Sequence, residues 1–124
     1  MGPVPVFIVE DSQHMRSALR DLVEVSGPFH VVGTAEGETE ATEWLIRHKR
    51  GWRLAILDLL LAEGSGFGLV QRCRSEGTGG KIVIFSEFAS PAVKERCLAL
   101  GADAAFLKSE MKSLVHYLEQ AAVA

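Results

Sequence analysis

The stretch Leu54-Ala55-Ile56-Leu57-Asp58 is an unbroken apolar run that ends in a single carboxylate. A strand that is buried on both faces of a sheet has such a run, rather than an alternation of polar and apolar residues. Four more runs of this kind occur in the chain: Val6–Val9, Phe29–Ala35, Ile82–Phe85 and Ala104–Leu107. The sequence therefore predicts five strands, each buried on both faces.

Stretches with helical spacing lie between and after these runs. Met15, Leu19 and Leu22 recur at helical intervals after the first run, and Met111 and Leu114 do so after the last. Alternating strands and helices form a parallel sheet that carries helices on both faces, joined by right-handed crossovers. We therefore expect an α/β fold with five helices and a doubly wound, five-stranded parallel sheet in the common order 2-1-3-4-5.

Turn and capping residues support these boundaries. Ser90-Pro91 combines an N-cap residue with the proline favoured at the first helical position, and Gly101 lies where that helix should end. Ser109 is predicted to cap the last helix in the same way. Pro5 is acceptable in a central strand only as its first residue.

Length and composition indicate one domain that spans residues 1–124. Of the 124 residues, 48% are hydrophobic, which suffices for a core without disulfides or structural metals.

A net charge of −3 without a long basic run argues against direct nucleic-acid binding and favours protein partners. The apolar runs are too short to cross a membrane, and the first nine residues lack a secretion signal, so we expect a cytoplasmic protein.

Cysteine and tryptophan residues are interpreted as packing residues. Cys73 and Cys97 lie in apolar-periodic helical stretches, and a domain of this size does not require a disulfide. Trp44 and Trp52 flank the second predicted helix and are expected to pack against it.

Polar residues follow four of the five predicted strands. These residues are Glu10-Asp11 after the first strand, Asp58 after the third, Ser86 after the fourth and Lys108 after the fifth. The second strand ends in Ala35 and lies at the sheet edge in the expected order. Ligands of such sheets bind outside the carboxyl ends of the strands, so the polar groups should converge on one shallow site.

The residue types at this site favour a metal-assisted phosphoryl transfer. Three neighbouring carboxylates repel one another unless cations compensate, and Lys108 and a divalent metal can do so. Mg²⁺ prefers oxygen ligands, a role that suits Asp11 and Asp58 with Glu10 bound directly or through water, and no Cys/His cluster favours zinc. We select Asp58 as the nucleophile that forms an aspartyl-phosphate, because it stands alone at the end of a central strand. Lys108 would then stabilise the phosphoryl oxygens, and Ser86 would donate a hydrogen bond to the attached group.

At this point the whole chain resembles the receiver domains of two-component response regulators, which have the flavodoxin-like fold. The matching motifs are Val6-Phe7-Ile8-Val9-Glu10-Asp11, Ile56-Leu57-Asp58 with Gly66 eight residues later, Ile84-Phe85-Ser86, Gly101-Ala102-Asp103 and Phe106-Leu107-Lys108-Ser109. The resemblance implies transfer to Asp58 from the phosphohistidine of a histidine kinase or phosphotransfer protein. It implies Mg²⁺ held by Glu10, Asp11, Asp58 and the Leu60 carbonyl, and a helix 4, strand 5 and helix 5 face that signals to a downstream protein. It also implies slow self-catalysed dephosphorylation, without turnover of an external substrate.

Two positions depart from the family pattern. Many receivers have proline four residues after the acceptor, where this chain has Ala62, so a looser loop around Leu60 is expected. The switch aromatic of the family lies three residues before the lysine, where this chain has Ala105. Phe106 is one residue later and should point to the opposite face of the sheet. Phe88 is the alternative aromatic, with partial burial in its loop as the competing interpretation.

Two polar residues near the site have weaker functional interpretations. Glu87 lies in the loop where receivers vary the residues that tune dephosphorylation and kinase choice, with a solvated charge as the alternative. His14 is interpreted as a solvated helix residue, with contact to a phosphodonor as the alternative.

Two other function classes compete with a phosphorylation switch. A constitutive protein-interaction module of receiver type would not need a phosphorylation cycle; the intact acidic site argues against it, whereas Ala105 leaves it open. A flavin- or nucleotide-binding protein would need a phosphate cradle after the first strand. The turn at that place, Glu10-Asp11-Ser12-Gln13, is acidic and has no glycine, so it disfavours this class.

Overall fold

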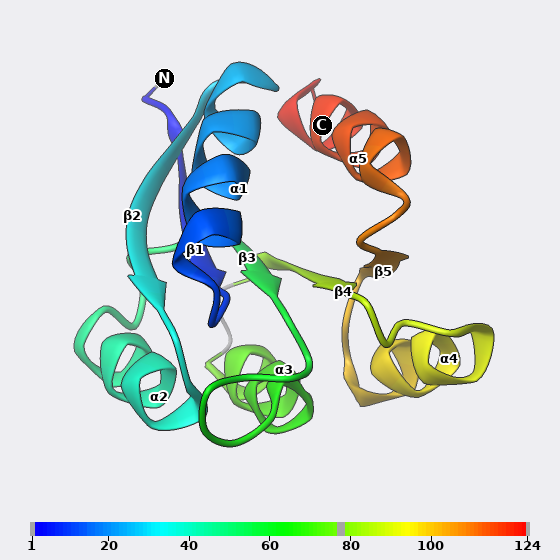
Figure 1. Cartoon of the computed structure of the whole chain (residues 1–124). Helices are drawn as coiled ribbons and strands as arrows, with labels where there is room; N and C mark the ends of the chain where they lie inside the picture. Colours follow the sequence, from blue (N-terminus) through cyan, green and yellow to red (C-terminus); the bar gives the residue numbers. More distant parts are fainter. Residues whose placement is uncertain (1, 77–78, 124) are drawn as a thin grey trace.

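The computed structural model describes residues 2–76 and 79–123 as a parallel sheet between two layers of helices (Figure 1). In chain order the elements are β1 (Val4–Val9), α1 (Gln13–Val25), β2 (Phe29–Ala35), α2 (Glu38–Arg47), β3 (Leu54–Leu57), α3 (Gly66–Ser75), β4 (Lys81–Ser86), α4 (Pro91–Leu100), β5 (Ala104–Leu107) and α5 (Met111–Val123). The strand order is β2-β1-β3-β4-β5, with every pair of neighbours parallel. The predicted fold class and strand order are therefore confirmed.

The sheet separates two hydrophobic clusters. Alternate residues of each strand point to opposite faces, so Phe7 and Val9 join the cluster under α2, α3 and α4, whereas Val6 and Ile8 join the cluster under α1 and α5. Figure 1 shows α1 and α5 on one side of the sheet and the other three helices on the opposite side. Trp44 lies within α2 and stacks on Phe7, with ring centroids 4.1 Å apart.

The central strands are buried on both faces, but the two edge strands are not. All four residues of β3 are buried, whereas buried and exposed residues alternate at the start of β2, and the β5 residues are half-buried. An edge strand has only one neighbour and is covered less completely, so the prediction of two-sided burial was wrong for β2 and β5.

The position of Pro5 within β1 differs from the expectation as well. Pro5 is the second residue of the strand, where it pairs with His30 of β2. The pairing of β1 with β3 starts only at Val6, so the missing amide hydrogen of Pro5 falls where the strand has one neighbour.

Helix ends confirm two of the three capping predictions. The Ser90 hydroxyl accepts a hydrogen bond from the Val93 amide, and Gly101 ends α4 with a φ of 121°. The Ser109 prediction was wrong, because α5 begins at Met111 and the carbonyl of Glu110 accepts the hydrogen bond from the Leu114 amide. Glu110 therefore occupies the N-cap position of α5.

Gly66 begins α3 directly beneath the loop that follows β3. Its amide donates to the Leu59 carbonyl at 3.0 Å, and a Cβ added at this position would collide with the carbonyl oxygen of Asp58. Only a residue without a side chain allows this approach.

Gly66→Ala should lower the free energy of unfolding by about 2–3 kcal/mol, because the β3–α3 loop must shift to admit the methyl group. Urea unfolding measures the change. Gly2→Ala is the matched control, since a Cβ at Gly2 meets nothing within 4 Å. Equal stability of the two variants would contradict this account of the loop.

Candidate phosphoacceptor and metal site

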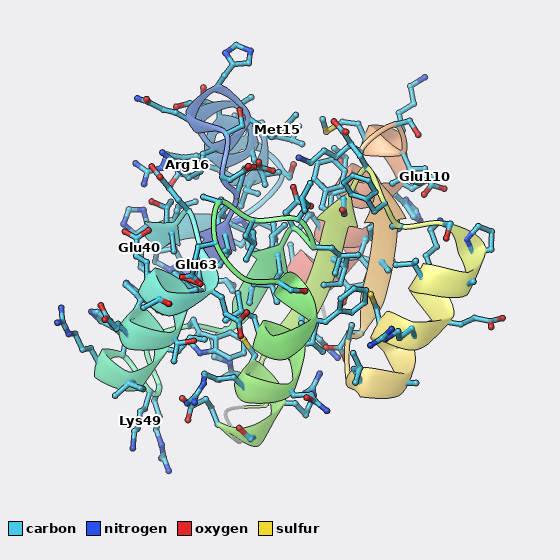
Figure 2. The ribbon with its side chains drawn as sticks, turned by 60° about the horizontal axis from the view of Figure 1, so that its bottom comes forward. Met15, Arg16, Glu40, Lys49, Glu63 and Glu110 are labelled. Carbon is cyan, nitrogen blue, oxygen red and sulfur yellow. The ribbon has the colours of Figure 1, made fainter. Side chains whose placement is uncertain are left out.

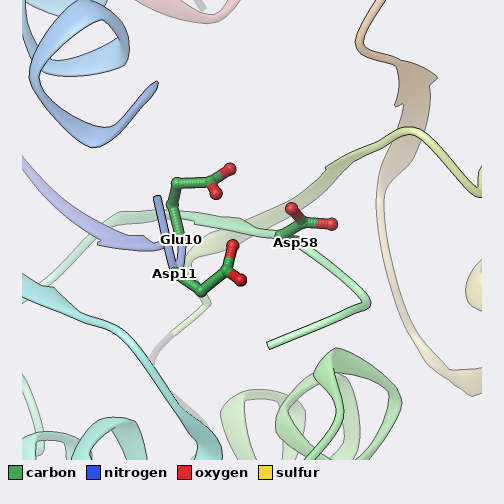
Figure 3. Close-up of side chains that lie close together, drawn as sticks. All are labelled: Glu10, Asp11 and Asp58. Atoms are coloured by element: carbon green, nitrogen blue, oxygen red, sulfur yellow. The ribbon is translucent and has the colours of Figure 1, made fainter. Parts of the chain in front are cut away.

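Three carboxylates meet at the carboxyl ends of β1 and β3. Val9 of β1 is in register with Leu57 of β3, so the residues that follow these two strands lie side by side. One carboxylate oxygen each from Glu10, Asp11 and Asp58 all lie within 4.8 Å of one another. Figure 3 shows the three side chains close together at the ends of these strands. The structure thus brings together the predicted carboxylate ligands.

Lys108 reaches the same carboxylates from the end of β5. Its Nζ lies 2.7 Å from Glu10 Oε1 and 2.8 Å from Asp58 Oδ2. Burial acts to lower the pKa of Lys108, but the hydrogen bonds and charges of Asp58 and Glu10 outweigh it and raise the pKa above its usual value. The ammonium group is therefore charged at neutral pH and compensates the two buried acids.

Backbone amides bind the remaining oxygens of the buried acids. The Leu59 amide donates to Asp58 Oδ1 at 2.7 Å, and the Ser12 amide donates to Glu10 Oε2 at 3.0 Å. Burial nevertheless raises the pKa of Glu10, and the contacts with Lys108 and Ser12 offset this only in part. Glu10 and Asp58 are thus fixed by several contacts, whereas Asp11 is exposed.

A shallow cavity of about 200 Å³ opens above these groups. Its lining comprises Glu10, Asp11, Ser12, Asp58, Leu60, Glu87, Phe88 and Lys108. The donors in the cavity are carboxylate oxygens without thiol or imidazole, a set that suits Mg²⁺ and does not suit zinc. Leu60 belongs to this lining.

Ser86 lies at the end of β4 and is fully buried. Its hydroxyl oxygen accepts a hydrogen bond from the Phe88 amide at 3.2 Å. Ser86 is not among the residues that line the cavity, and its hydroxyl contacts the loop before α4.

Ala105, at the position of the switch aromatic, and Phe106 point to opposite faces of the sheet. Ala105 packs against the cluster under α2, α3 and α4, whereas Phe106 packs on the other face, where its ring meets that of Tyr117 at 5.9 Å. Phe106 therefore does not replace an aromatic at position 105. Phe88 is 54% exposed and lines the cavity, so it is a partly covered loop aromatic that lies beside the site.

The loop that carries Leu60 is fastened to α2. Glu38 Oε1 accepts from the Ser65 amide at 2.8 Å, and the Glu38 amide donates to the Glu63 carbonyl at 2.8 Å. The Thr39 amide donates to Glu63 Oε1 at 3.1 Å. These contacts fasten the loop to α2 although Ala62 stands at the position of the family's proline. The two glutamates have no recognisable spacing in the sequence, so sequence analysis missed them.

Of the two polar residues with weaker functional interpretations, Glu87 lies at the cavity and His14 does not. Glu87 is exposed at the cavity, whereas His14 is exposed in the first turn of α1 and does not line it.

Cys73 and Cys97 are unpaired core residues of α3 and α4, and burial raises the pKa of Cys73 to about 12. The cysteines are therefore packing residues, as predicted.

Comparisons with known proteins agree with this geometry. Residues 6–119 match the family described as the response regulator receiver domain. The nitrate/nitrite response regulator protein NarL of Escherichia coli K12 is 26% identical over 121 residues, which are 97% of this chain and 55% of NarL. The transcriptional regulatory protein PhoP of the same strain is 33% identical over 98 residues, which are 79% of this chain and 42% of PhoP.

Solved structures show the same fold. The signal receiver domain of the putative response regulator NarL from Mycobacterium tuberculosis superposes with a TM-score of 0.84 at 23% identity, over 100% of this chain and 99% of that one. The chain belongs to the response regulator receiver domain family of two-component systems. It spans about half the length of the curated relatives it matches. Within the described residues, no helix has the length and apolar character needed to cross a membrane.

Lys108→Met should destabilise the protein in EDTA by about 3 kcal/mol, because it leaves two buried carboxylates without their cation. Mg²⁺ should restore part of this loss, since it supplies positive charge to the same oxygens. Urea unfolding with EDTA and with Mg²⁺ measures both effects. Lys81→Met, at the exposed start of β4, is the control. A Lys108→Met protein as stable as the wild type in EDTA would show that the ion pairs contribute little.

Proposed function

We propose that this domain is a phosphorylation switch that accepts a phosphoryl group on Asp58 with the help of Mg²⁺. The donor would be the phosphohistidine of a sensor histidine kinase or phosphotransfer protein, and the recipient of the signal a downstream protein. The observation that carries the proposal is the contact of Lys108 with Asp58 beside two further acids. A carboxylate nucleophile, a fixed ammonium group and a set of metal ligands are the parts that this reaction needs.

Each residue would have a defined part in the transfer. An Asp58 carboxylate oxygen forms the new P–O bond while the P–N bond to the donor imidazole breaks, and the imidazole nitrogen regains a proton from solvent. Glu10, Asp11, Asp58 and the Leu60 carbonyl would hold Mg²⁺, which neutralises charge on the phosphoryl oxygens. Lys108 exchanges its contact with the Asp58 carboxylate for one with a phosphoryl oxygen. Removal of the phosphoryl group by water would reset the domain, without an external substrate.

The cavity faces solvent on the side from which a phosphodonor would approach. Glu87 and Phe88 are exposed there, and Leu60 is 59% exposed. Exposed apolar side chains beside an acidic cavity suit contact with a protein donor. We therefore assign these three residues to the donor-facing rim.

Signal transmission is proposed to start at Ser86. If its hydroxyl turns toward a phosphoryl group on Asp58, the Phe88 amide loses its present partner. The loop before α4 would then move, and with it Phe88. Lys94 of α4 forms a 2.7 Å ion pair with Glu110, the residue before α5. That ion pair links α4 to α5, so movement of α4 would reach the proposed helix 4, strand 5 and helix 5 surface.

Incubation with Mg²⁺ and acetyl phosphate should add one phosphoryl group to the wild-type protein, measured by intact mass. Asp58→Asn should abolish the adduct, whereas Asp21→Asn, an exposed aspartate on α1, should not. An adduct that survives Asp58→Asn unchanged would refute the acceptor assignment. No adduct on the wild type, with no binding of beryllofluoride, would support a constitutive interaction module instead, the alternative that Ala105 leaves open.

Beryllofluoride with Mg²⁺ should shift the amide proton resonance of Phe88 upfield, because that amide loses its hydrogen bond to Ser86. In Ser86→Ala the resonance should already lie upfield in the free protein and move little on binding. The Val93 amide, bonded to the Ser90 hydroxyl at 3.4 Å, is the comparison within the same spectrum. A Phe88 resonance that stays in place while beryllofluoride binds the wild type would contradict this route.

A further inference from the structure

We propose that Arg16 is a positioning residue of the metal site, which holds the Glu10-Asp11 turn so that both carboxylates face Asp58. This inference rests on the proposed function. Arg16 Nη1 donates to the Glu10 carbonyl at 2.8 Å and to the Asp11 carbonyl at 3.3 Å. The arginine side chain is only 15% exposed, so it is held in place. A single guanidinium nitrogen thus contacts the backbone of two of the proposed ligands.

The carbonyl contacts fix the direction of the backbone in the acidic turn. The Glu10 amide donates to the Ala35 carbonyl at 3.0 Å, and the Ser12 carbonyl accepts from the Arg16 amide at 2.8 Å, so both ends of the turn are anchored. Between these anchors, the Glu10 and Asp11 carbonyls contact the Arg16 side chain. The direction of a carbonyl depends on the dihedral angles that also direct the neighbouring side chains. Loss of these two bonds would therefore let the carboxylates of Glu10 and Asp11 turn away from Asp58.

Arg16 is also connected, through Glu36, to the loop that carries Leu60. Its Nη2 lies 3.3 Å from Glu36 Oε1, and the Glu36 carbonyl accepts from the Ala62 amide at 3.1 Å. Ala62 belongs to the loop that carries Leu60, so Arg16 connects the acidic turn to the other proposed ligand segment. In Figure 2, Arg16 on α1 and Glu40 on α2 lie on the same side of the molecule. The Glu36 carboxylate is 57% exposed, which makes this second connection the weaker one.

Charge and geometry predict opposite effects of an Arg16 substitution on the affinity for Mg²⁺. A cation near the site repels Mg²⁺, so loss of the charge alone would tighten metal binding. Loss of the carbonyl contacts would weaken it, because the ligands lose their orientation. Arg16→Lys separates the two effects, since lysine keeps the charge but its ammonium group ends about where the guanidinium carbon lies, one bond short of the Nη1 atom that contacts both carbonyls.

Mg²⁺ titration of the full chain, followed by the amide resonance of Leu59, tests the proposal. Arg16→Lys should raise the dissociation constant of Mg²⁺ about tenfold, as for other residues that orient metal ligands. Arg20→Lys, one turn further along α1 and exposed, should leave it unchanged. At saturating Mg²⁺, the rate of adduct formation from acetyl phosphate on Arg16→Lys should return to the wild-type rate.

Three results would overturn the proposal. One is a dissociation constant for Arg16→Lys within about twofold of the wild type, well below the effect expected of a positioning residue. Another is an Arg16→Lys protein that unfolds in EDTA or stays slow at saturating Mg²⁺, which would show a general structural role. A wild-type protein that binds no Mg²⁺ would refute the proposed function along with this inference, whereas the first two results leave that function intact.

Discussion

Lys108 makes ion pairs with two buried carboxylates, and the geometry of the whole site depends on this contact. The lysine follows β5, while Glu10 follows β1 and Asp58 follows β3. Burial of three charged groups is unfavourable unless they compensate one another, so the ends of these strands must stay in register. The parallel sheet meets this requirement, because all its strands end at the same edge.

The loops around the ion pairs complete the site with backbone groups. Amides of Ser12 and Leu59 bind the carboxylate oxygens that Lys108 leaves free. Arg16 on one side binds the backbone of the Glu10-Asp11 turn, and Glu38 on the other binds the backbone of the loop after β3. These contacts orient the carboxylates and the loops that line the acidic cavity.

Sequence patterns predicted the strands and the carboxylate cluster well, because both follow from local rules. Apolar runs mark strands, and the polar residue after each run must lie at one edge of a parallel sheet. The patterns failed where contacts with residues distant in the sequence determine burial, capping or the position of a loop. Edge strands are less covered, Glu110 rather than Ser109 caps α5, and Glu38 fastens the loop near Ala62. Arg16 was missed although it lies five residues after Asp11, because only the folded turn shows which carbonyls its side chain reaches.

The central claim is that Asp58, the neighbouring acids and Lys108 form one phosphoacceptor site. A crystal structure of the protein with Mg²⁺ and beryllofluoride tests this claim most directly. We expect beryllofluoride bonded to an Asp58 carboxylate oxygen, with Lys108 Nζ in contact with a fluorine and Mg²⁺ bound beside Asp11. A well-ordered site that lacks beryllofluoride, or that holds it on a different carboxylate, would contradict the account.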